Sequence, residues 1–106
     1  MSISEADKRV LQQLAANGDN AVIPRPVMHF FYGEVDQLSE LNQRIAFPGW
    51  NGSELAKGSD DYRLTVTKVT DLTEESVQLM MSEVEQATAG LDLDYDGWET
   101  SVEQSS

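Results

Sequence analysis

The sequence has no cysteine, a single histidine and few basic residues, and each shortage excludes a class of function. Without cysteine, disulfides, thiolate zinc sites, iron–sulfur clusters and cysteine nucleophiles are excluded. Seven Lys and Arg stand against nineteen Asp and Glu, which gives a formal net charge of −12. Nucleic acids and anionic membranes are bound through basic surfaces, so this charge argues against direct binding to either. No apolar run approaches the length of a membrane span, and the first residues lack an apolar signal core.

The length and the hydrophobic content of the chain are sufficient for one small folded unit. The chain has 106 residues, of which 40% are hydrophobic, so it can bury one modest core. We therefore expect a single domain over residues 1–106. Because disulfide staples and an export signal are lacking, we also expect a cytoplasmic location.

The acidic residues are distributed unevenly along the chain. Residues 1–68 contain nine acids and all seven bases, whereas residues 69–106 contain ten acids and no base. This excess is either a binding face for a basic partner or a solvated surface that keeps the protein soluble.

The first half of the chain predicts a helix, a strand and a second helix. Ser4 is a suitable N-cap for a helix that stops at Gly18 and whose apolar stripe is Ile3, Val10, Leu11 and Leu14. Residues 27–33 are apolar at both odd and even positions, which predicts a central strand covered on both faces. Asp36 then favours the start of a short helix that ends by Pro48 and buries Leu38, Leu41 and Ile45.

The second half predicts an edge strand, a half-buried strand, a helix and a final strand. Residues 50–56 favour a short edge strand before a turn at 57–60. In the alternating segment that follows, the inward-facing residues are Tyr62, Leu64 and Val66, which predicts a half-buried strand. Thr73 is a good N-cap for a helix that Gly90 ends and whose apolar stripe is Val77, Met80, Met81 and Val84. Residues 91–96 alternate strictly, which predicts a strand with an acidic outer face.

This element order predicts an α+β fold. An N-terminal helix is followed by β-α-β-β-α-β, which is typical of the ferredoxin-like sandwich. In that fold two helices cover one face of an antiparallel four-stranded sheet.

The last part of the chain matches a calcium-binding motif, but we interpret it as a strand. Residues 92–103 match the EF-hand loop, with a turn at Gly97 and oxygen ligands at Asp92, Asp94, Asp96 and Glu103. An EF-hand needs a helix that leaves the loop, and only three residues follow Glu103. The alternation of apolar and acidic residues favours a strand instead, so we predict neither a metal site nor a cofactor.

His29 and Trp98 are each open to two interpretations. His29 lies inside a predicted strand and has no second histidine or cysteine to share a metal, so we interpret it as a core residue with a local hydrogen bond. A bulge at Gly97 would turn Trp98 onto the buried face. The alternative for Trp98 is an exposed indole that contacts a partner.

The segment 93–99 resembles the C-terminal signature of a known family. Its residues Tyr95, Asp96, Gly97 and Trp98 stand where the RraB family, inhibitors of ribonuclease E, typically has Tyr-Asp-Gly-Trp. Three further segments are similar to the first strand, the third strand and the start of the second helix of that family, namely 25–33, 62–66 and 72–77. Residues 10–19 resemble the helix that precedes the sheet in many members.

The resemblance implies the same sandwich and a non-catalytic regulator that binds ribonuclease E and modulates RNA turnover. Such regulators carry a long acidic tail after the signature, whereas only eight residues follow Trp98 here. We expect a basic, arginine-rich segment of the partner to dock on the acidic last third, with contacts at Asp92, Asp94, Asp96, Glu99 and Glu103. The alternative is an acidic nucleic-acid mimic or an adaptor that binds another basic protein.

Overall fold

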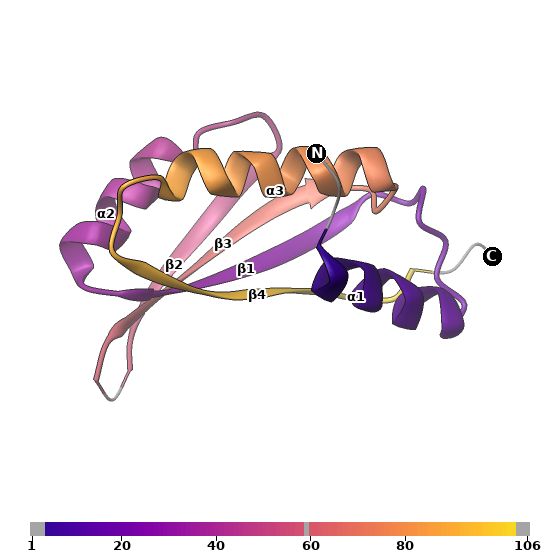
Figure 1. The fold of residues 1–106 in the computed structure, drawn as a ribbon, viewed down its shortest axis with the longest axis horizontal. Coiled ribbons are helices and arrows are strands. Elements are labelled where there is room, and N and C mark those ends of the chain that lie inside the picture. The colour runs from indigo at the N-terminus through magenta and orange to yellow at the C-terminus, as the bar shows by residue number, and fades with distance from the viewer. Residues whose placement is uncertain (1–3, 59, 104–106) are drawn as a thin grey trace.

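The computed structural model describes residues 4–58 and 60–103, so the predicted stripe residue Ile3 and Ser59 of the predicted turn lie outside the described residues. The described residues form three helices and four strands (Figure 1). In chain order these are α1 (Glu5–Ala16), β1 (Arg25–Gly33), α2 (Val35–Arg44), β2 (Trp50–Lys57), β3 (Tyr62–Thr70), α3 (Glu74–Thr88) and β4 (Leu93–Thr100).

The four strands form one sheet in the order β2-β3-β1-β4, and every neighbouring pair is antiparallel. This order, with α2 and α3 as the two crossover helices, is that of the ferredoxin-like sandwich. The predicted fold class is therefore confirmed. β2 is an edge strand, as the sequence predicts for residues 50–56, and β1 lies inside the sheet.

The helix starts follow from capping residues. The Ser4 side chain accepts a hydrogen bond from the backbone N–H of Asp7 at the start of α1. The Thr73 side chain likewise accepts from the backbone N–H of Ser76 at the start of α3. The predicted cap at Asp36 is wrong by two residues. α2 begins after Glu34, and Asp36 lies in its first turn, where the helix dipole favours a carboxylate.

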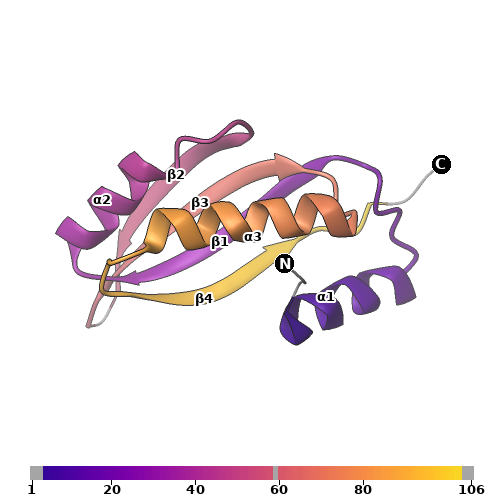
Figure 2. The ribbon, with the colours of Figure 1, turned by 45° about the horizontal axis from the view of Figure 1, so that its top comes forward.

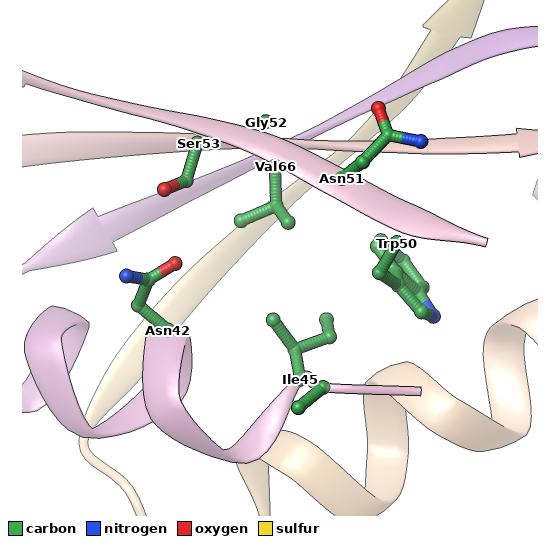
Figure 3. Close-up of a pocket in the computed structure, with 8 residues that line it drawn as sticks. Asn42, Ile45, Trp50, Asn51, Gly52, Ser53 and Val66 are labelled. Atoms are coloured by element: carbon green, nitrogen blue, oxygen red, sulfur yellow. The ribbon is translucent and has the colours of Figure 1, made fainter. Parts of the chain in front are cut away.

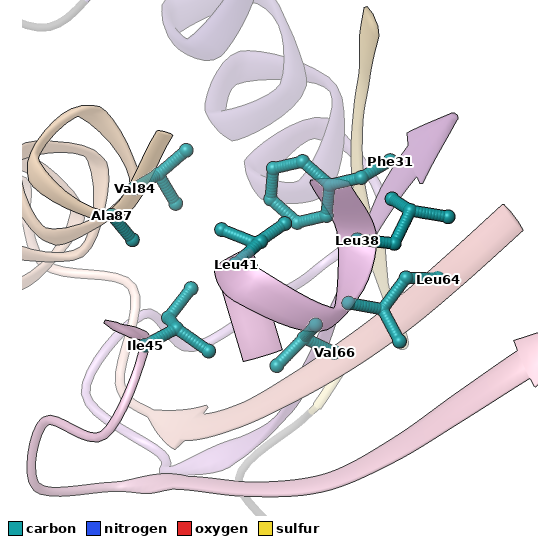
Figure 4. Packing of buried hydrophobic residues seen from close by; sticks show 8 residues of the cluster. All are labelled: Phe31, Leu38, Leu41, Ile45, Leu64, Val66, Val84 and Ala87. Carbon is teal, nitrogen blue, oxygen red and sulfur yellow. The ribbon is translucent and has the colours of Figure 1, made fainter. Parts of the chain in front are cut away.

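Both hydrophobic clusters lie on one face of the sheet. The first joins α2, β1, β3 and α3 (Figure 4) and consists of Phe31, Leu38, Leu41, Ile45, Leu64, Val66, Val84 and Ala87. The second lies toward the start of α3 and consists of Val27, Leu72, Val77, Met80 and Trp98. The expectation that β1 is covered on both faces is wrong, because only its odd-numbered side chains from Arg25 to Phe31 are fully buried.

The N-terminal helix extends this packing past the edge of the sheet. Figures 1 and 2 show α1 beside β4, whereas α2 and α3 lie over the sheet. The predicted stripe residues Val10, Leu11 and Leu14 pack against the second cluster. The Trp98 indole N–H donates to Asp7 Oδ1 at 2.8 Å, which joins α1 to β4. No described element covers the opposite face of the sheet, which we call the open face.

Candidate functional site

The open face carries the predicted acidic residues of β4. Asp94 lies opposite Tyr32 of β1, and Glu99 lies opposite Met28. Between these two pairs, Asp96 and Gly97 both fall opposite Phe30, because the register shifts there. Three carboxylates therefore border β1 along its length, all of them exposed, and we call them the acidic ridge: Asp94, Asp96 and Glu99.

Gly97 produces this arrangement. Its φ of +95° belongs to the left-handed region that favours glycine, and the extra residue restores the inward direction of the next side chain. As a result, Tyr95 and Trp98, which are an odd number of residues apart, both face the helices, and Trp98 is only 9% exposed. The predicted bulge and buried indole are confirmed, and the exposed alternative for Trp98 is wrong.

The two remaining predicted acids are placed differently. Asp92 is exposed just before β4, and its backbone N–H donates to the Gln37 side chain at 3.0 Å. The Glu103 carboxylate instead accepts from the Ser101 hydroxyl at 3.0 Å. The structure thus places Asp92 in the segment that precedes β4 and Glu103 in the segment that follows it, so neither belongs to the acidic ridge.

The carboxylates of Asp92 and the acidic ridge have no internal partners in the part of the chain that the structure describes, unlike two other acids of the last third. Within the described residues, no hydrogen bond or ion pair involves the carboxylates of Asp92 or of the acidic ridge. By contrast, Asp71 accepts from the N–H and hydroxyl of Thr73, and Glu83 pairs with Lys68. The acidic ridge is therefore available to a partner without loss of any intramolecular bond.

An apolar row on β1 lies beside the acidic ridge. Met28, Phe30 and Tyr32 point to the open face and are half-buried by their neighbours. On the other side of this row, β3 places Thr67, Thr65 and Arg63 in register. The Arg63 guanidinium lies 5.9 Å from the centre of the Phe30 ring, within the range of a cation–π contact.

The helix side of the sheet holds a buried polar pair centred on His29. This histidine has no solvent exposure, and its Nδ1 lies 2.7 Å from the Tyr95 hydroxyl. Burial, aided by the charge of Lys68, lowers the pKa of His29 to about 3. Burial also raises the pKa of the Tyr95 hydroxyl, with a smaller contribution from Asp7. The neutral ring and its local hydrogen bond agree with the structural interpretation of His29.

A second buried group was not identified from the sequence. Lys68 forms an ion pair with Glu83 beneath α3, and the Trp50 indole N–H donates to the same carboxylate at 2.9 Å. Both charged side chains are more than nine-tenths buried. The alternation of β3 continues as far as Lys68, and this continuation was the only signal that could have placed its side chain inward.

A third buried group joins the segment between α1 and β1 to the segment that follows β4. Arg25 is 2% exposed, pairs with Asp19, and donates to the carbonyl oxygens of Asn20, Ile23 and Ser101. The Glu103 backbone N–H also donates to Asp19. Burial alone would raise the pKa of Asp19, but these bonds and the charge of Arg25 outweigh burial and lower it.

The calcium-loop pattern does not form a loop. Its residues 93–100 are the strand β4, in which successive side chains point to opposite faces. In the described part of the chain, no group of three or more Asp, Glu, His or Cys residues is arranged to hold a metal ion.

Two cavities lie between α2 and β2. The cavity in Figure 3 has a volume of about 210 Å³ and is lined by Asn42, Ile45, Ala46, Trp50, Asn51, Gly52, Ser53 and Val66. Its neighbour, of about 220 Å³, extends the groove toward Val35 and Leu55. The lining residues include no acid, base or histidine, so these cavities offer no group for acid–base or nucleophilic chemistry.

The chain belongs to the RraB family. The family model described as regulator of ribonuclease activity B matches residues 4–100, which include every helix and strand of the fold. Among curated proteins, none matches the sequence. In the described residues, no helix is long and apolar enough to cross a membrane.

Proposed function

We propose that this member of the RraB family is a non-catalytic, cytoplasmic regulator that inhibits ribonuclease E by binding a basic segment of it. The observation that carries the proposal is the acidic ridge, whose three carboxylates are exposed and have no partner within the described residues. A protein with a net charge of −12 is attracted to a basic segment before contact, which raises the association rate.

Among the described residues, no catalytic group is assembled on the open face, which supports a role in binding. The sole histidine, His29, is fully buried on the opposite side of the sheet. The family match supports regulation of a ribonuclease in particular. The regulator would act by occupying or displacing contacts of the enzyme, without a chemical step of its own.

The test is the affinity of the full chain for ribonuclease E, measured by calorimetry at two salt concentrations. In one variant the acidic ridge is neutralised by Asp94→Asn, Asp96→Asn and Glu99→Gln. Three exposed ion pairs at about 0.2–1 kcal/mol each predict a loss of roughly 0.6–3 kcal/mol, or about 3- to 150-fold in affinity. The loss is expected to be smaller at high salt, where exposed charges are screened.

A matched control removes the same charge elsewhere. Glu74→Gln, Glu75→Gln and Glu85→Gln neutralise three exposed acids of α3, which lies on the far side of the sheet. The control should bind and inhibit like the unmodified chain. Equal weakening in both triple variants would reduce the effect to net charge and contradict a specific site. Tight binding to an unrelated basic protein, without binding to ribonuclease E, would favour a nucleic-acid mimic or an adaptor.

A further inference from the structure

We propose that the apolar row Met28, Phe30 and Tyr32 is the floor of a docking surface for an arginine-bearing protein segment, whose guanidinium groups stack on the rings and pair with the acidic ridge. This inference rests on the proposed function and specifies the chemistry of the partner at that site. It adds residues of β1 that neither the charge pattern nor the family signature in β4 indicates.

The geometry of the sheet brings the two kinds of group together. Directly opposed side chains on neighbouring antiparallel strands have Cβ atoms about 4.5–5.5 Å apart. Tyr32 and Asp94 are such a pair, and so are Met28 and Glu99. A planar cation lying over one of the rings therefore has a carboxylate within reach at the same level of the sheet. From Met28 to Tyr32 the row extends about 13 Å, at 3.3–3.4 Å per residue, which suits a short segment and not a whole domain face.

The protein itself contains one example of this contact. Arg63 comes from β3, on the side opposite the acidic ridge, and its guanidinium lies 5.9 Å from the centre of the Phe30 ring. The Phe30 ring is thus placed where a guanidinium can lie over it. A partner arginine approaching from the β4 side would meet the carboxylates that Arg63 does not reach. Arginine stacks on aromatic faces and binds carboxylates with a planar fork, whereas lysine is a strongly hydrated point charge.

Charge excludes the other common occupants of an open sheet. On the described strands, four acids and one base face this way: Glu54 of β2, Arg63, and the acidic ridge. Two copies placed face to face would oppose the same acids, and nucleic acids or anionic lipids would be repelled in the same way. A cationic protein segment is the occupant that this combination of rings and carboxylates complements.

The experiment compares octa-arginine and octa-lysine peptides, which carry equal charge, for binding to the full chain. Stacking on one or two of these half-buried rings predicts that octa-arginine binds about two- to thirtyfold more tightly. In the floor variant Phe30→Thr with Tyr32→Thr, this preference should disappear while octa-lysine binds as before. Leu79→Thr, which replaces an exposed apolar residue of α3, is the matched control and should change neither affinity.

Chemical-shift mapping on the unmodified chain gives a second readout that does not depend on folding of the variants. Octa-arginine should shift the resonances of β1 and β4, with smaller effects on α3. Equal affinity of the two peptides, or shifts confined to β4, would overturn the docking floor. Neither result would contradict the proposed function if neutralising the acidic ridge still weakens binding to ribonuclease E. If the neutralised variant binds ribonuclease E as tightly as the unmodified chain, the proposed function fails as well.

Discussion

The stability of this protein is expected to fall between pH 8 and pH 5 because of His29. The side chain is fully buried, and burial together with the charge of Lys68 lowers its pKa to about 3. In an unfolded chain the pKa of histidine is about 6.5. Between these values the unfolded state binds a proton that the folded state does not bind. Lowering the pH therefore shifts the equilibrium toward unfolding.

The magnitude follows from the two pKa values. With a folded pKa of about 3, the free energy of unfolding falls by about 1.4 kcal/mol per pH unit below pH 6.5. Between pH 8 and pH 5 the loss is about 2 kcal/mol. The stabilisation is fully present above pH 6.5 and is lost as the pH falls toward the folded pKa. The pKa of Asp19 and that of Asp71 are also lowered, but from 3.8, so their contributions are lost at lower pH than this window.

The assay is urea unfolding of the unmodified chain and of His29→Gln at several pH values from 8 to 5. Glutamine keeps a polar group near the Tyr95 hydroxyl and does not titrate. The other ionisable groups are common to both proteins, so their contributions cancel in the difference between the two curves. We expect the unmodified chain to lose about 2 kcal/mol more than the variant over this range. Parallel curves would refute the reasoning.

Three further substitutions test how the fold is held together. Trp98→Phe removes the N–H that Asp7 accepts and leaves a buried carboxylate unpartnered, so urea unfolding should show a loss of about 1–3 kcal/mol; an unchanged midpoint would contradict the role of this bond. Glu83→Gln leaves Lys68 as an uncompensated buried charge and should cost about 3–5 kcal/mol, whereas the double variant with Lys68→Met should recover part of that loss in a thermal scan. Gly97→Ala places a side chain at a φ of +95° where no atom lies within 4 Å of the new Cβ, so backbone strain alone should lower stability by about 1–3 kcal/mol, and an unaltered melting temperature would argue against the bulge.

The order of elements could be predicted because local signals agree with the fold. The caps at Ser4 and Thr73 and the glycine stops mark helix ends, and the strict alternation around Leu64 marks a half-buried strand. The bulge at Gly97 could also be predicted, because a buried tryptophan directly after a glycine conflicts with simple alternation. Each of these signals lies within a few residues of the feature that it determines.

The buried charges could not be predicted, because their partners lie far away in the sequence. Asp7 and Trp98 are 91 residues apart, and nothing near Asp7 indicates that a partner will arrive. The same holds for Arg25, which donates to the carbonyl of Ser101 across 76 residues. Charged residues are almost never fully buried without a partner, so a sequence pattern assigns them to the surface by default. Only the folded topology supplies their partners.

Two buried acids on the helix side support the fold, whereas the acidic ridge on the open face is free to bind a partner. Glu83 and Asp7 lie on the helix side, where they accept hydrogen bonds from the buried Lys68 and Trp98, and their removal is expected to cost stability. The acidic ridge lies on the open face with no internal partner, and in a chain of net charge −12 its neutralisation relieves like-charge repulsion. Variants of the acidic ridge should therefore lose partner binding while stability is unchanged or slightly raised. A parallel loss of both properties would mean that these carboxylates support the fold through contacts that the structure does not contain.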